Sequence, residues 1–229
     1  RFMRGLDSEG NWRTPFNPRA SNHRNDDYCE GTAWQWTWFV PHDVDGLVEL
    51  MGGRDAFIGK LDSLFTADSK LEGESTSVDI SGLIGQYAHG NEPSHHIAHL
   101  YNYVGQPWRT QEIVDEVLHT LYFNNPDGLS GNEDCGQMSA WYILNAMGFY
   151  QVCPGKPVYS IGRPLFNEAT VHLKDGKSFK VIAHNNSRDN KYVQSIVLNG
   201  HKLETPFFTH QDIVDGGTLE LTMGSEPLK

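Results

Sequence analysis

The hydrophobic and polar positions divide the chain into a helical part, residues 28–150, and a strand-rich part that follows it. Residues 54–68 place apolar side chains at the spacing of an amphipathic helix. These side chains are Phe57, Ile58, Leu61, Leu64 and Phe65. Residues 32–53 predict two short helices that are interrupted at Pro41, the second ending at Gly52-Gly53. The first 27 residues show no period and predict an irregular lead-in.

Three further segments of the helical part predict helices. Residues 93–105 begin with Pro93, which suits the first helical turn, and end at Gly105. Residues 110–123 carry one apolar stripe, which consists of Ile113, Val114, Val117, Leu118 and Leu121. Residues 135–148 are the most apolar segment, and we therefore expect the most buried helix there.

After Gly148 the pattern changes to alternating and β-branched segments. Examples are VYSIG, ATVHL, SFKVIAH, YVQSIVL and TLELTMG, separated by the turn sequences KDGK, NNSRDN, LNGHK and VDGG. The pair Asn199-Gly200 is a strong hairpin signal. The sequence therefore predicts an α+β fold that is mainly α, in which helices are followed by a small antiparallel β region.

Charge and composition restrict the partners. The formal net charge of −11 over 229 residues argues against nucleic acid and anionic membranes as partners. No segment approaches the roughly 18 apolar residues that a membrane span needs. The start lacks both an initiator Met and the apolar core of a signal peptide, so we expect a piece of a longer chain. Cys29, Cys135 and Cys153 have no CxxC spacing, which favours thiols but leaves one disulfide open.

The first candidate site lies where Glu30 precedes three tryptophans, Trp34, Trp36 and Trp38. Indole faces stack well on the apolar faces of sugar rings. The alternative is that the tryptophans belong to the core and that Glu30 interacts with a helix N-terminus.

The second candidate site is residues 89–96, HGNEPSHH. His95 and His96 are adjacent and would point to different helix faces, and no HExxH spacing exists, so a zinc site is disfavoured. Hydrogen bonding to a polyol fits better, although a capped helix start would show the same residues.

Three more acids stand at the starts of helices. Glu112 falls in a first helical turn, and Glu133 and Asp134 precede another helix, where a carboxylate is stabilised in its charged form. An ionised carboxylate suits a general base, although capping alone would also explain it. Acids interleaved with Trp, His, Asn and Gln are what glycoside hydrolysis requires, which indicates a carbohydrate-active enzyme.

Four long motifs, in this order along residues 28–172, closely resemble glycoside hydrolase family 92. They are YCEGTAWQWTWFVPHDV, YAHGNEPSHHIAHLYNYVGQPWRTQE, GLSGNEDCGQMSAWYILNAMGFYQVCPG and YSIGRPLFNEATVHL. Members of that family are calcium-dependent, inverting exo-α-mannosidases. The resemblance implies that residues 1–150 form the C-terminal part of an (α/α)6 barrel and that residues 151–229 form a β region packed on it. The family's N-terminal β-sandwich domain is expected to lie outside this sequence.

The resemblance also implies roles for single residues. Glu30 matches the family's general acid and Asp134 its general base, while Asn132 replaces an acid that some members carry two positions earlier. Glu112 matches the side-chain ligand of Ca2+, and oxygens near Asn91 are expected to complete that site. The expected substrate-binding residues are Trp34, Trp36, Glu92, His95, His96 and Gln137.

The sequence therefore predicts part of an exo-α-mannosidase, with α-1,2 as the commonest linkage in the family, acting on mannose-containing glycans. Family members act in the periplasm, at the cell surface or outside the cell. One alternative is a non-catalytic glycan-binding module, against which the retention of both Glu30 and Asp134 argues. Another is an α/α-toroid hydrolase that acts on a different sugar, whose activity would persist when calcium is chelated. Exposed barrel helices predict aggregation or an oligomer.

Overall fold

A computed structural model describes residues 1–23 and 25–229. Its contacts group the chain into two compact units, which are described one at a time. Unit 1 comprises residues 1–95 and 121–138, and unit 2 comprises residues 96–120 and 139–229. Both helices and strands are present, as the sequence indicates. The expected family domains, with a boundary near residue 150, stay a prediction.

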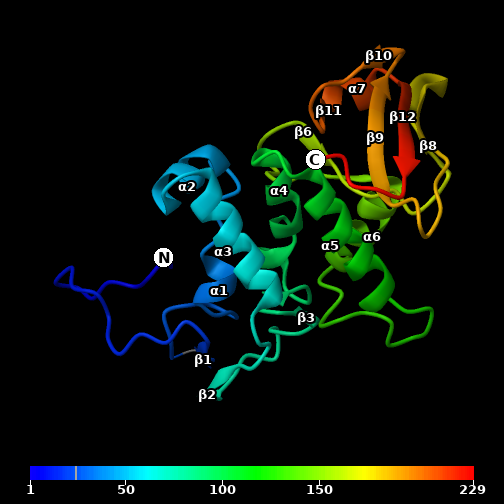
Figure 1. The fold of residues 1–229 in the computed structure, drawn as a ribbon. Coiled ribbons are helices and arrows are strands. Elements are labelled where there is room, and N and C mark those ends of the chain that lie inside the picture. The colour runs from blue at the N-terminus through cyan, green and yellow to red at the C-terminus, as the bar shows by residue number, and fades with distance from the viewer. Residues whose placement is uncertain (24) are drawn as a thin grey trace. The chain divides into compact units, whose positions relative to one another are not determined.

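Unit 1 consists of helices, short strand pairs and long loops (Figure 1). Its elements are β1 (Ala20–Asn22), α1 (Ala33–Trp36), α2 (Val44–Met51), α3 (Arg54–Thr66), β2 (Glu72–Ser75), β3 (Leu83–Ile84), β4 (Tyr87–Ala88) and the 3-10 turn η1 (Glu92–Ser94). The gap between α1 and α2 contains Pro41, which confirms the predicted interruption. Gly52 ends α2 with a φ of 105°, a left-handed conformation that glycine adopts without steric cost.

The core of unit 1 is formed by the predicted stripe of α3. Phe57, Leu61 and Leu64 are fully buried, and Phe65 is 7% exposed. Trp38 packs edge-on against Phe57, with ring centroids 5.4 Å apart. The helical period read from the sequence is confirmed here, because the burial of these side chains fixes the face of α3.

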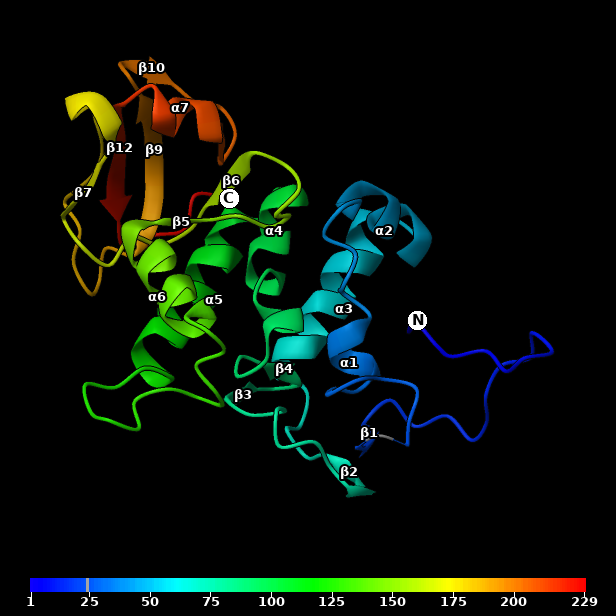
Figure 2. The same ribbon diagram turned by 180° about the vertical axis from the view of Figure 1, so that it is seen from behind.

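Unit 2 begins with helices and ends with strands (Figure 2). Its elements are the 3-10 turn η2 (Ile97–His99), α4 (Leu100–Tyr103), α5 (Pro107–Thr120), α6 (Gln137–Met147), β5 (Phe149–Tyr150), β6 (Val158–Ile161), β7 (Glu168–His172), the 3-10 turn η3 (Lys174–Gly176), β8 (Ser178–His184), β9 (Tyr192–Leu198), β10 (His201–Lys202), β11 (Phe207–Thr209), α7 (His210–Val214) and β12 (Gly217–Gly224). The first two residues of α6 group with unit 1.

The five-stranded sheet of unit 2 has the order β10-β9-β12-β8-β7. β9 and β12 run side by side in both views (Figures 1 and 2). The prediction of a purely antiparallel region is wrong for one pair, because β12 is parallel to β8. β12 comes last in the chain and enters between β8 and β9, which run in opposite directions. A strand in that position must be parallel to one of them, and side-chain alternation carries no information about direction.

The predicted hairpin is confirmed, and the sheet has a buried core. Asn199 and Gly200 join β9 to β10 with φ values of 51° and 81°, both in the left-handed region that a two-residue turn of this type requires. One face of the sheet buries a cluster that includes Phe179, Leu219 and Leu221, each 0% exposed.

Two helical predictions differ from the structure. Residues 93–105 do not form one α-helix: η1, η2 and the four-residue α4 follow one another. Several side chains in this stretch make hydrogen bonds that hold its backbone in place. One of them runs from Asn102 Nδ2 to the Ile161 carbonyl at 2.8 Å. Helix α6 buries Trp141 completely but leaves Ile143 56% exposed. The expectation that α6 is the most buried helix is wrong, because its apolar residues cover more than one face.

No helix among the described residues is both long and apolar enough to cross a membrane. The three cysteines are free thiols in this structure, with Cys29 and Cys135 exposed and Cys153 half-buried. The expectation of unpaired thiols is therefore confirmed.

A fully buried histidine in unit 2 ties η2 to β6 and α6. His99 Nε2 lies 2.9 Å from Asn145 Oδ1, and His99 Nδ1 lies 3.0 Å from Ser160 Oγ. The Asn145 amide is oriented by its own bond from Nδ2 to the Trp141 carbonyl, so its oxygen must accept the proton of His99 Nε2. His99 is therefore neutral, and burial lowers its pKa from 6.5 to about 4.

We expect this histidine to make the protein less stable in acid. The folded pKa lies below the unfolded one, so the contribution is complete above pH 6.5 and is lost as the pH falls towards 4. The full loss amounts to about 3 kcal/mol of unfolding free energy. Urea denaturation at about pH 7 and about pH 4.5 should show a smaller decrease for His99→Gln than for the wild type. The exposed control His172→Gln should match the wild type, and equal decreases in all three would contradict the assignment.

Candidate active site

Three carboxyl groups come together in unit 1. Glu30 lies just before α1, Glu92 begins η1, and Asp134 lies just before α6. The pKa of Glu92 is raised, first by burial and then by the charge of Asp134, a hydrogen bond with Asp134 and the charge of Glu30. The pKa of Glu92 is therefore affected by both of the residues that the sequence predicts as acid and base, although these two are 104 positions apart in the chain.

Glu92 and Asp134 are hydrogen-bonded to each other. Two carboxyl groups can share a hydrogen bond only if one of them is protonated. Burial and the charges of Asp134 and Glu30 both disfavour the ionised form of Glu92, which is why its pKa is raised.

The backbone at both predicted catalytic residues is left-handed. Glu30 has a φ of 53°, Asp134 of 51° and its neighbour Cys135 of 57°. Such values are uncommon for residues other than glycine and persist where surrounding contacts hold them. Here Asn91 Nδ2 donates to the Glu30 carbonyl at 2.9 Å, and the Gln137 amide donates to the Asp134 carbonyl at 3.2 Å.

The three tryptophans are held in different ways. Trp34 packs edge-on against Phe2 at 4.9 Å, and Lys60 Nζ lies 3.8 Å from its ring centroid. Trp36 donates from Nε1 to the Cys29 carbonyl at 2.7 Å and so supports the turn that carries Glu30. Trp38 is fully buried in the core. The substrate-binding roles of Trp34 and Trp36 stay predictions.

A buried polar chain lies in the same unit. His95, which is 2% exposed, places Nε2 2.9 Å from the His89 carbonyl, and Gln137 Nε2 lies 3.1 Å from its Nδ1. His89 in turn contacts the hydroxyl groups of Tyr87 and Tyr122. Tyr122 could not be selected from the sequence, because it lies in a segment without a recognisable motif.

Two of the predicted site residues belong to unit 2. His96 is 4% exposed. Glu112 lies in the second turn of α5, so its predicted place in the first turn is wrong, because the helix already begins at Pro107. Glu112 Oε1 accepts from Tyr192 Oη at 2.8 Å, and Glu112 Oε2 lies 2.5 Å from Arg109 Nη1.

The donor set for calcium is incomplete in this arrangement. Calcium takes about 6–8 oxygen ligands. No group of three or more His, Cys, Asp or Glu side chains among residues 1–23 and 25–229 could hold a metal ion. A cation bound by Glu112 would have to replace the Arg109 ion pair, because a guanidinium beside the carboxylate opposes a second positive charge. Asn91 offers a neutral oxygen, but no reaction step below passes through a metal.

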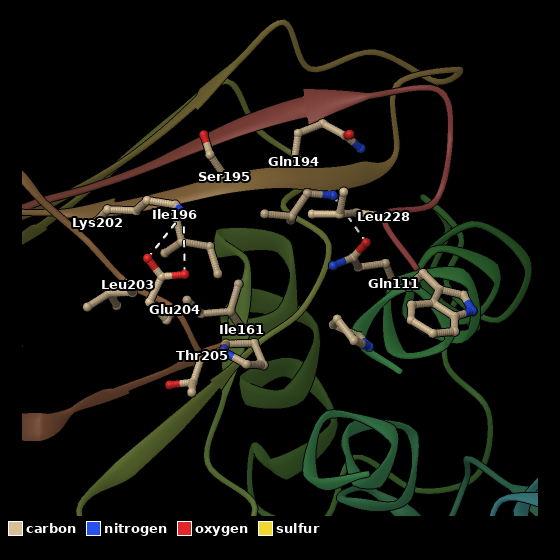
Figure 3. A pocket seen from close by; sticks show the side chains of 14 residues that line it. Gln111, Ile161, Gln194, Ser195, Ile196, Lys202, Leu203, Glu204, Thr205 and Leu228 are labelled. Atoms are coloured by element: carbon tan, nitrogen blue, oxygen red, sulfur yellow. Dashed lines mark hydrogen bonds and ion pairs between the residues drawn. The ribbon is translucent and has the colours of Figure 1, made fainter. Parts of the chain in front are cut away.

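A hollow of about 170 Å³ in unit 2 is not the active site (Figure 3). It is smaller than ordinary ligand pockets, which measure about 300–1,000 Å³. Several of its polar groups are already paired: Gln111 Oε1 accepts from the Val193 amide at 3.1 Å, and Lys202 Nζ lies 3.1 Å from Glu204 Oε1. Glu204 is the single carboxylate among the lining residues, so the pair needed for glycoside hydrolysis is missing there.

The chain is similar to known glycosidases over nearly all of its length. Two solved structures from Bacteroides thetaiotaomicron each cover 99% of the chain. A family GH92 α-mannosidase in complex with mannoimidazole is 43% identical with a TM-score of 0.92. A family GH92 inverting mannosidase is 42% identical with a TM-score of 0.84. An uncharacterized secreted glycosidase of Arthroderma benhamiae is 32% identical over 86% of the chain.

The chain spans only part of these relatives. It covers 30% and 31% of the two solved chains and 24% of the Arthroderma protein. The family model described as the glycosyl hydrolase family 92 catalytic domain matches residues 1–225. The chain therefore belongs to glycosyl hydrolase family 92.

Proposed function

We propose that this chain supplies the acid and the base of an inverting exo-α-mannosidase. This enzyme hydrolyses terminal mannose from glycans and prefers the α-1,2 linkage. The observation that carries the proposal is the grouping of Glu30, Glu92 and Asp134 in unit 1. Inverting glycosidases need one carboxyl group on the leaving oxygen and one carboxylate on a water molecule. The similarity to a family GH92 inverting mannosidase supports the same stereochemistry.

The reaction follows from these assignments. Glu30 donates a proton to the glycosidic oxygen while the bond from that oxygen to the anomeric carbon breaks. Asp134 takes a proton from a water molecule that attacks the anomeric carbon from the opposite face, which inverts its configuration. Glu92 is proposed to hold the Asp134 carboxylate in one orientation through the hydrogen bond between the two side chains.

Substrate recognition is proposed for the side chains around this group. Gln137 Nε2 contacts His95 Nδ1, and this contact orients the Gln137 amide, which is proposed to bind a sugar hydroxyl. Trp34 and Trp36 are proposed as aromatic contacts, and His96 as a further polar contact of unit 2. The similarity to a secreted glycosidase supports a periplasmic, cell-surface or secreted location. Association through exposed apolar side chains such as Ile143 stays a prediction.

Mannose release from α-1,2-mannobiose tests the proposal. We expect calcium-dependent release that EDTA removes and added calcium restores, with slower release from the α-1,3 and α-1,6 disaccharides. Calcium would supply binding of the sugar hydroxyls, and Glu112 and Asn91 are the residues proposed to hold it. Magnesium in place of calcium is the control, because it demands a stricter octahedral geometry. Full activity in EDTA would contradict the calcium proposal, and mannose binding without any release would instead favour a glycan-binding module.

A further inference from the structure

A chain of hydrogen bonds runs through the interior of unit 1 to the start of α6. Tyr87 Oη lies 2.8 Å from His89 Nδ1, and His89 Nε2 lies 2.7 Å from Tyr122 Oη. Tyr122 Oη donates to the Met138 carbonyl at 3.2 Å. Tyr87 and His89 are 0% exposed, so bulk water does not compete for these groups. The chain therefore connects the strand and loop before Glu92 with the segment after Asp134.

The direction of every proton in this chain follows from its last member. A carbonyl oxygen only accepts, so the single hydroxyl proton of Tyr122 points to Met138. Tyr122 must then accept from His89 Nε2, which places the ring proton on that nitrogen. His89 Nδ1 is left as the acceptor for the hydroxyl proton of Tyr87.

A second branch has the same direction. His95 Nε2 faces the His89 carbonyl and must donate to it, so His95 Nδ1 accepts from Gln137 Nε2. Each of the two imidazoles thus carries a proton on Nε2.

Both branches end on the turn that carries Asp134. Gln137 and Met138 form the start of α6, and their backbone amides donate to the carbonyls of Asp134 and Glu133 at 3.2 and 3.3 Å. At the other end of the chain, His89 lies three residues before Glu92, the hydrogen-bond partner of Asp134. The polar chain therefore links the loop of Glu92 to the turn of Asp134 through side chains as well as through the carboxyl pair.

We propose that Tyr122 is a positioning residue. Its hydroxyl group accepts a hydrogen bond from His89 and donates one to the start of α6, and so it fixes the position of Asp134 relative to Glu92. This role rests on the function proposed above. Its structural content, the proton on His89 Nε2 and the restraint on residues 133–138, can be measured without turnover. Tyr122 acts through the backbone at the start of α6.

The test uses Tyr122→Phe, which removes one oxygen and keeps the ring. Tyr159→Phe is the matched control, because Tyr159 Oη lies 3.1 Å from His210 Nδ1 in an exposed tyrosine–histidine contact of unit 2. Amide hydrogen exchange of residues 133–138 should become faster in Tyr122→Phe and stay unchanged in Tyr159→Phe. The NMR spectrum of the wild-type histidine nitrogens should show the His89 proton on Nε2. A proton on Nδ1, or unchanged exchange in Tyr122→Phe, would overturn the proposal.

Kinetics separate this proposal from the proposed function. If the wild type releases mannose, Tyr122→Phe should lower kcat about tenfold to a hundredfold, as a small misplacement of a catalytic group does, with KM within about twofold. An unchanged kcat would reject the positioning role while the mannosidase function stands. If the wild type releases no mannose, the proposed function fails, and hydrogen exchange together with the proton position still decides the role of Tyr122.

Discussion

Glu30→Gln and Asp134→Asn are each expected to lower kcat for release of mannose from α-1,2-mannobiose by about 10²–10⁴-fold, the usual contribution of a general acid or base. Gln cannot donate a proton to the leaving oxygen at neutral pH, and Asn cannot accept one from water. The glycosidic oxygen is a poor leaving group without protonation, and water is a weak nucleophile without a base. Measured kcat and KM for both variants check the prediction.

The two substitutions should leave the fold intact. Asp134 has a φ of 51°, a conformation that Asn adopts readily, so Asp134→Asn introduces no new backbone cost. Asp127→Asn is the matched control, since Asp127 is an exposed acid of the same segment outside the proposed site. Its kcat should equal that of the wild type. Loss of activity in Asp127→Asn as well would attribute the effect to the segment and not to Asp134.

Asp115→Asn is expected to cause the largest loss of stability. Asp115 Oδ1 lies 2.8 Å from Arg163 Nε, and the two side chains are 9% and 2% exposed. Arg188 Nη1 at 3.8 Å and His119 Nδ1 at 3.3 Å also face the Asp115 carboxylate. Removing the acid leaves a buried guanidinium without its counter-charge, which costs about 3–5 kcal/mol of unfolding free energy. Urea denaturation of the protein, followed by far-UV circular dichroism, measures this loss.

The exposed pair Glu168 and Lys180 is the matched control. Their charged atoms lie 2.9 Å apart, but the side chains are 56% and 38% exposed. Glu168→Gln should therefore cost no more than about 1 kcal/mol. Arg163→Met combined with Asp115→Leu should be less damaging than the sum of the two single variants, because no charge stays buried alone. Equal effects of Asp115→Asn and Glu168→Gln would contradict the importance of burial.

The sequence predicted those features that depend on local pattern. Leu61 and Leu64 marked the buried face of α3, and Asn199-Gly200 marked the hairpin, because helical period and turn chemistry are local properties. The parallel pairing of β12 with β8 was not predictable in this way. It depends on where the last strand enters the sheet, which is decided by packing over the whole of unit 2.

The candidate site shows the same division. Glu30, Glu92 and Asp134 could be selected because each lies in a motif, whereas their grouping is a tertiary fact. Tyr122 had no motif, and its contacts to His89 and Met138 appear only in the folded unit. The tryptophans show the converse, since Trp38 has the pattern of a sugar platform and lies fully buried in the core.

The most direct test of the assigned roles is the hydrolysis of 2,4-dinitrophenyl α-mannoside, whose leaving group departs without protonation. We expect Glu30→Gln to hydrolyse this substrate at nearly the wild-type rate. Asp134→Asn should hydrolyse it far more slowly, because the attacking water still needs its base. Equal loss of activity in both variants, or the reverse order, would contradict the assignment of Glu30 as acid and Asp134 as base.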